Sequence, residues 1–128
     1  MGTADVVIVG AGPYGLSLAA HLAASDVDVL VFGPSMKTWR DGMPAGMKLK
    51  SEGFASSLSD PDGSYTLAHY CREHGIAYAE SGWPVPVEVF ATYGQAFARR
   101  FVPQLDERKV TRVARSGQDF TVELDDHE

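Results

Sequence analysis

The chain has 128 residues, with 11 basic and 17 acidic side chains and a net charge of −6, which is enough chain for one domain with a buried core. No cluster of Lys and Arg alternates with aromatic residues, which argues against nucleic acid as a partner. The apolar stretch near the start is interrupted by Gly10, Gly12 and Pro13, short of the roughly 20 residues that span a bilayer, and no secretory signal precedes it, so we expect a cytoplasmic protein without membrane contact.

The first predicted elements are a strand over residues 6–9, a glycine turn, and a helix over residues 13–25. The turn has the pattern G-x-G-x-x-G, between an apolar strand and a helix, as dinucleotide binding requires. Gly10 permits the tight turn, Gly12 lets the backbone approach a pyrophosphate, and Gly15 lets the helix pack closely on the strand. Pro13 suits the first helical position, and Tyr14 follows it. Phosphate is the natural ligand of the free N–H groups at such a helix start.

A second strand over residues 27–32 completes a right-handed βαβ unit with two parallel strands. The run over residues 6–9 is continuously apolar, which is typical of a parallel strand covered on both faces. An Asp or Glu usually follows the second strand and binds the ribose hydroxyls, but Gly33 stands there. Two explanations remain open. Either Lys37 or Arg40 binds the 2′-phosphate of NADP, or the Gly33 backbone and the Ser35 hydroxyl hold the ribose of a flavin nucleotide.

The remaining elements are a long ordered loop and three more units of regular structure. Spaced apolar residues predict that residues 33–63 form a ligand-wrapping loop with a short helix over 36–41. Helices are expected over residues 65–74, with Cys71 in the core, and over 88–101, with an aromatic stripe. A hairpin follows, with strands on either side of residues 116–119. The one cysteine excludes an internal disulfide and a C-x-x-C pair.

These elements predict an α/β fold. It is a partial Rossmann-like FAD/NAD(P)-binding parallel sheet with a β-hairpin from an incomplete meander. We expect residues 1–128 to form a single, incomplete FAD/NAD(P)-binding domain.

Two segments, residues 10–15 and 39–51, resemble the amino-terminal part of flavin-containing, NADPH-dependent monooxygenases, including Baeyer-Villiger and N-hydroxylating relatives. The resemblance implies that FAD is the cofactor and that NADPH binds through parts outside this chain. It also implies that Trp39 lies near the flavin, that residues 49–51 next meet the cofactor, and that Val110 lies on the strand passing the adenine. The candidate cofactor-binding residues are Gly10, Gly12, Pro13, Tyr14, Gly15, Gly33, Ser35, Met36, Trp39, Lys50, Ser51 and Val110.

The expected function is that of the FAD-binding portion of a flavin-dependent, NAD(P)H-linked oxidoreductase. In such enzymes the flavin supplies the chemistry, so the sequence assigns no catalytic residue, and no histidine has a metal-ligand context. The isolated chain is expected to lack full activity. Two alternatives remain: a truncated or split non-catalytic dinucleotide-binding module, which would need a complementing chain or homo-oligomer, and an NADP-binding domain.

Overall fold

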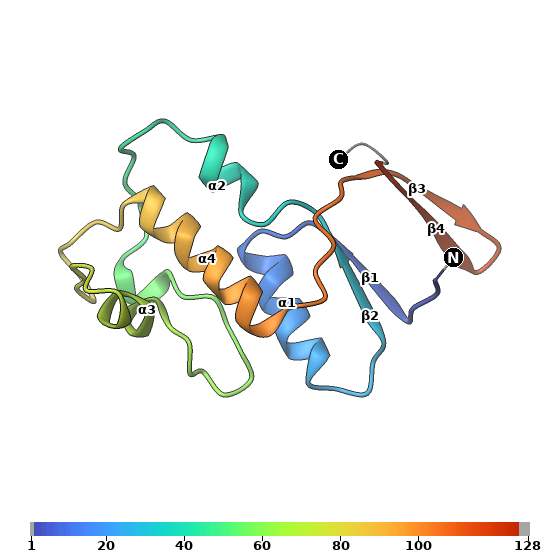
Figure 1. Ribbon diagram of the computed structural model, residues 1–128, viewed down its shortest axis with the longest axis horizontal. Coiled ribbons are helices and arrows are strands. Elements are labelled where there is room, and N and C mark those ends of the chain that lie inside the picture. The colour runs from blue at the N-terminus through green and yellow to red at the C-terminus, as the bar shows by residue number, and fades with distance from the viewer. Residues whose placement is uncertain (1, 126–128) are drawn as a thin grey trace.

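The computed structural model describes residues 2–125, and its elements follow the predicted order. They are β1 (Val6–Val9), α1 (Pro13–Ala23), β2 (Val29–Phe32), α2 (Lys37–Asp41), the 3-10 helix η1 (Gly53–Ala55), α3 (Leu67–Glu73), α4 (Val87–Phe101), β3 (Val110–Ser116) and β4 (Asp119–Leu124). Figure 1 shows a small parallel sheet with helices beside it and a separate hairpin. The predicted α/β fold is confirmed.

The strands β1 and β2 run parallel and are joined by α1, as the sequence predicts. Val6 pairs with Val29 at one end of the ladder and Val9 pairs with Phe32 at the other. Just beyond the ladder, the Gly10 N–H donates to the Phe32 carbonyl at 2.8 Å. The glycine turn therefore begins at the carboxyl ends of both strands.

An unexpected feature is a short segment that lies along β2 on the side away from β1. Asp106 forms an isolated parallel bridge with Phe32. The Asp106 N–H donates to the Val31 carbonyl at 3.0 Å, and the Gly33 N–H donates to the Asp106 carbonyl at 2.9 Å. This segment belongs to the connection between α4 and β3, so it brings a distant part of the chain to the end of β2.

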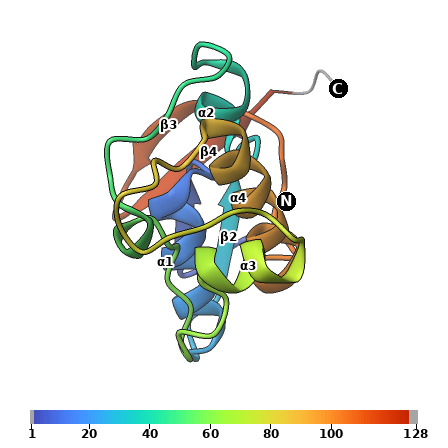
Figure 2. The ribbon, with the colours of Figure 1, turned by 90° about the vertical axis from the view of Figure 1, so that its left-hand side faces the viewer.

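The core lies between one face of this sheet and the helices, with α1 and α4 packed side by side (Figure 2). The α1 side chains in it include Leu16 and Ala19, and α4 contributes Tyr93 and Phe97. The predicted aromatic stripe of α4 thus faces the core. Cys71 of α3 is also buried, and burial raises the pKa of its thiol, which fits the packing role expected for it.

The opposite face of β1 differs from the prediction. Val7 and Val9 are 36% and 55% exposed, whereas Ile8 is buried. The expectation of a strand covered on both faces is wrong for residues 2–125, because α1 covers one face only and no described element packs on the other. Apolar side chains thus remain exposed on this strand.

The long loop after β2 is held by buried polar contacts. The Asp60 carboxylate accepts hydrogen bonds from the backbone N–H groups of Asp62, Ser64 and Tyr65. The Tyr93 hydroxyl donates to the Tyr65 carbonyl at 2.7 Å and accepts from the Leu58 N–H at 3.0 Å. These contacts fasten the loop to α4.

The hairpin forms a sheet of its own, with Ser116 paired to Asp119 across a turn at Gly117, whose φ is +65°. Its strands and turn agree with the prediction. No helix within residues 2–125 is long and apolar enough to cross a membrane.

Candidate dinucleotide-binding site

A cavity of about 530 Å³ lies where β1 and β2 end. In open α/β folds, ligands bind in the crevice beyond the carboxyl ends of the parallel strands. The cavity is lined by Gly10, Ala11, Gly12, Pro34, Lys37, Thr38, Trp39, Asp41, Gly42 and Lys109. The glycine turn, α2 and the segment before β3 therefore meet at one place.

The glycines of the turn meet the geometric demands of their positions. Gly10 has a φ of +116°, which L side chains rarely adopt, and the space beside it is open. A Cβ on Gly15 would collide with the Gly10 carbonyl oxygen, so the close packing of α1 on β1 requires glycine there. Gly15 thus acts in packing, while Gly10 keeps the mouth of the cavity open.

The start of α1 presents unused donors beside this opening. The Leu16 N–H bonds to the Gly12 carbonyl at 2.9 Å, which closes the first helical turn. Within residues 2–125, the N–H groups of Gly12, Tyr14 and Gly15 have no hydrogen-bond acceptor. Three backbone donors and the positive end of a helix dipole suit a phosphate group. The Tyr14 side chain is 90% exposed.

The backbone conformation and close surroundings of residue 33 explain why glycine, and not Asp or Glu, follows β2. Its φ is +134°, and a Cβ there would lie 3.3 Å from the Ala11 nitrogen and 3.4 Å from the Gly10 Cα. A carboxylate-bearing side chain would be strained in this backbone conformation and crowded against the glycine turn. The absence of Asp or Glu thus follows from close contact between two loops.

Ser35 is engaged by a carboxylate that the sequence reasoning missed. The Ser35 N–H and hydroxyl both donate to Glu107 Oε1, at 2.9 and 3.1 Å. Ser35 is buried, so its hydroxyl proton is committed to this contact. The two residues are 72 positions apart, and no local pattern in the sequence indicates that they meet.

Only one of the two cations that the NADP alternative names lines the cavity. Lys37 and Arg40 each approach the Asp41 carboxylate at 3.5 Å on the exposed side of α2. Lys37 lines the cavity and Arg40 does not, whereas Lys109, which the sequence reasoning missed, lines it from the segment before β3. Two lysines with one aspartate give this wall a modest positive charge.

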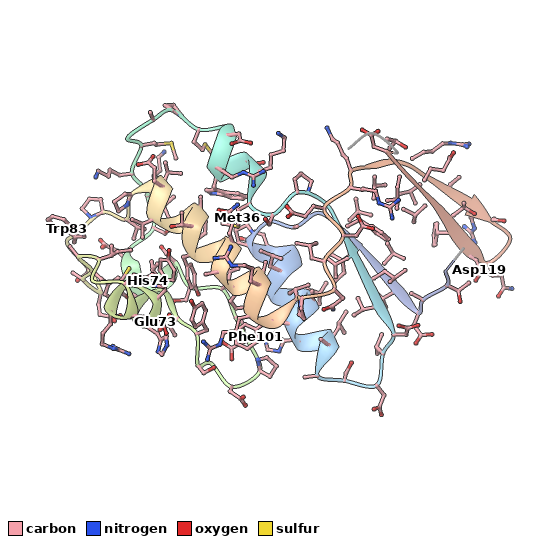
Figure 3. All side chains as sticks on the ribbon, viewed as in Figure 1. Met36, Glu73, His74, Trp83, Phe101 and Asp119 are labelled. Atoms are coloured by element: carbon pink, nitrogen blue, oxygen red, sulfur yellow. The ribbon has the colours of Figure 1, made fainter. Side chains whose placement is uncertain are left out.

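Met36 and Trp39 lie on either side of the start of α2 and have different surroundings. The Met36 side chain is fully buried against Gly94 of α4, and its N–H donates to the Ala11 carbonyl at 2.9 Å. Figure 3 shows Met36 between α2 and α4. The Trp39 ring packs edge-on against Phe90 at 5.9 Å between centroids, and its Cζ3 lies 3.2 Å from where a Gly12 Cβ would be. Trp39 therefore covers the glycine turn, whereas the Met36 side chain belongs to the core.

Three other candidate residues do not line the cavity. Lys50 is exposed on the loop after α2, and the Ser51 hydroxyl lies 2.7 Å from that of Ser56. Val110 begins β3, where it pairs with Leu124. Residues 2–125 contain no group of three or more His, Cys, Asp or Glu side chains placed to hold a metal ion.

Comparison with known proteins agrees with this geometry. Residues 8–60 match the NAD(P)-binding Rossmann-like domain family. A menaquinone reductase of Mycobacterium tuberculosis is 36% identical over 112 residues, which cover 83% of this chain and 26% of that protein. The chain therefore spans about a quarter of the length of this curated relative.

Solved structures extend the likeness to nearly the whole chain. A flavin-containing monooxygenase from Stenotrophomonas maltophilia superposes with a TM-score of 0.75 at 18% identity, over 100% of this chain and 36% of that one. A complex of OTEMO with FAD and NADP gives 0.68 at 21% identity, over 100% and 24%. The resemblance to flavin monooxygenases is thus confirmed at the level of the fold.

Proposed function

We propose that this chain, which shares its fold with a flavin-containing monooxygenase and matches the NAD(P)-binding Rossmann-like domain family over residues 8–60, is the FAD-binding portion of a flavin-dependent, NAD(P)H-linked oxidoreductase. The observation that carries the proposal is the set of unused N–H groups at the start of α1, next to the cavity that Gly12 and Trp39 line. The structural likeness to OTEMO, which was solved with FAD and NADP, supports the choice of ligand.

The residues fit a dinucleotide in distinct ways. The N–H groups of Gly12, Tyr14 and Gly15 would bind the pyrophosphate, and Pro13 fixes the start of the helix that carries them. Gly10 keeps the approach open, and Trp39 would lie beside the cofactor as the resemblance implies. Bound FAD would supply the redox chemistry, while the chain binds it, orients it and shields it from water.

The other candidate residues have less specific roles in the proposal. Gly33 and Ser35 lie at the end of β2, where the ribose is expected. Met36 takes part only through its backbone, which is tied to Ala11. Lys50, Ser51 and Val110 are assigned by the resemblance alone.

A complementing chain or a second copy is part of this proposal. Val7 and Val9 expose an apolar surface on β1, and the curated relative is about four times as long as the matched region. NADPH would bind through parts outside the 128 residues. The cytoplasmic location stays a prediction, which fractionation of cells producing the protein would check.

A second candidate is an NADP-binding domain, because Lys37 and Lys109 both line the cavity. The absorption spectrum of the purified protein separates the two. Flavin bands, or reconstitution with added FAD, support the first proposal. A colourless protein that binds NADPH tightly and leaves FAD fluorescence unchanged contradicts it. A chain that binds FAD but does not oxidise NADPH is a binding module.

The position of the flavin can be tested with the two tryptophans, Trp39 at the cavity and Trp83 far from it on the loop before α4 (Figure 3). In Trp83→Phe, only Trp39 emits, and we expect strong quenching when FAD binds. In Trp39→Phe, only Trp83 emits, and quenching should be weaker. Equal quenching in the two variants would contradict the placement of the flavin beside Trp39.

A further inference from the structure

We propose that Glu107 replaces the acid that is absent from the end of β2, and that its carboxylate binds the ribose hydroxyls of the dinucleotide. The site would then favour ligands with a free 2′-hydroxyl, such as FAD or NAD, over NADP. This inference rests on the proposed function and refines it, because it assigns the residue that selects between the two classes of ligand.

The backbone places Glu107 at the level where the acid is expected. Asp106 bridges Phe32, the last residue of β2, and its carbonyl accepts the Gly33 N–H. Gly33 comes directly after Phe32 on β2, and Glu107 comes directly after Asp106 on the neighbouring segment. The two residues therefore lie at the same level beyond the bridge. Figure 1 shows this connection between α4 and β3 passing the end of β2.

The carboxylate is held in a defined orientation. Its Oε1 accepts both the N–H and the hydroxyl of Ser35, which lies two residues beyond Gly33. Within residues 2–125, Oε2 has no partner, and the Glu107 side chain is exposed. One oxygen is therefore fixed by the protein, and the other can accept hydrogen bonds from a ligand.

Neighbouring charges leave this carboxylate available. Arg108 binds Asp106 through two guanidinium nitrogens, at 2.6 to 3.1 Å. Lys37 approaches Asp41 instead. Glu107 does not itself line the cavity, but Pro34, beside Ser35, and Lys109, two residues after Glu107, do. Both segments that hold this carboxylate therefore border the cavity.

The chemistry of the two ribose types decides the preference. A ribose diol offers hydroxyl donors to a carboxylate, and hydrogen bonds to a charged acceptor are stronger than neutral ones. A 2′-phosphate offers no such donor and repels a carboxylate of like charge. Glu107 would therefore stabilise one ligand and disfavour the other.

The test compares the binding of FAD, NAD⁺ and NADP⁺ by calorimetry in wild type, Glu107→Gln and a matched control. Gln retains an acceptor oxygen for Ser35 but carries no charge. We expect Glu107→Gln to weaken FAD and NAD⁺ binding by about tenfold, since hydrogen bonds to charged groups contribute on that order. NADP⁺ binding should be unchanged or tighter. Asp119→Asn makes the same charge change on the hairpin, far from the cavity (Figure 3), and should have no effect.

The Ser35→Ala variant gives an independent readout. It removes one of the two hydrogen bonds that orient Glu107. FAD and NAD⁺ should therefore bind more weakly than to wild type, but with a smaller loss of affinity than in Glu107→Gln. Unchanged affinities in Glu107→Gln, or equal losses for NAD⁺ and NADP⁺, would overturn the inference, because a structural role alone affects both ligands alike. If wild type binds none of the three, the proposed function fails, and this inference fails with it.

Discussion

Asp60 illustrates how one buried carboxylate organises a loop. It is 4% exposed, and it accepts hydrogen bonds from three backbone N–H groups and the Ser64 hydroxyl. Burial by itself would raise the pKa of this carboxyl, but the hydrogen bonds, led by that from the Tyr65 N–H, lower the pKa below its usual 3.8. A group with a lowered pKa stabilises the fold above its unfolded pKa, and that contribution is lost as pH falls through the folded value.

We therefore expect Asp60→Asn to lower the free energy of unfolding by about 1–3 kcal/mol at pH 7, because an amide cannot satisfy the same donors. The difference in unfolding free energy between the variant and wild type should become smaller below pH 3.8, where the wild-type carboxyl loses its charge by protonation. Urea unfolding at pH 7 and pH 3 measures both quantities. A difference that stays constant or grows at acid pH would contradict this account.

Tyr93 supplies a second test at the level of one group. Burial raises its pKa to about 12, so its hydroxyl stays protonated through neutral and mildly alkaline pH. Tyr93→Phe would leave the Leu58 N–H and the Tyr65 carbonyl without their partner. We expect a loss of about 1–3 kcal/mol in unfolding free energy, independent of pH between 6 and 9. Unchanged thermal stability would show that the loop does not depend on this contact.

At the level of elements, α2 is placed by its contact with α4. Met36 precedes α2 with a φ of 55°, which is uncommon for a non-glycine residue and costs about 1–3 kcal/mol. Its fully buried side chain fills the space left by Gly94. Because Trp39 lies on α2 and Phe90 on α4, this packing also sets the position of Trp39 over the glycine turn.

Gly94→Ala tests this packing. The new Cβ would lie 2.5 Å from Met36 Cγ and Sδ, so we expect a loss of about 1–3 kcal/mol in stability. Met36→Ala removes the clashing atoms. The double variant should therefore be less destabilised than the sum of the single variants, because residues in contact do not contribute additively. Strictly additive losses in thermal unfolding would mean that the two residues act independently.

Elements with strong local patterns could be predicted from the sequence. The apolar strand at β1, Pro13 at the start of α1 and the aromatic stripe of α4 each carry a periodic or positional signal. The glycine turn was found in the same way. Contacts between distant segments could not be predicted from the sequence. The contact of Asp106 with Phe32 and that of Glu107 with Ser35 correspond to no periodic or positional pattern. The burial of Met36 was missed because it depends on a glycine in another helix.

For the whole molecule, the described residues combine the features of a dinucleotide-binding site with an exposed apolar face on β1. The cavity, the donors of α1 and the positioned Glu107 lie at the carboxyl ends of the parallel strands, while Val7 and Val9 are exposed on β1. Val7 and Val9 do not line the cavity, so the candidate binding site and the exposed face of β1 are separate parts of the surface. Binding of FAD by this chain is therefore expected even if turnover requires a complementing partner.

The most direct test of this account is a FAD titration of wild type and Gly12→Val, followed by flavin fluorescence, with circular dichroism to confirm that both are folded. Valine at residue 12 would intrude where the pyrophosphate approaches and would press on the Trp39 ring. Gly2→Val, at a position with open space around it, is the control. We predict that wild type and the control quench FAD fluorescence and that folded Gly12→Val does not. Equal FAD affinity in folded Gly12→Val, or wild type that binds NADPH tightly and no FAD, would contradict the assignment.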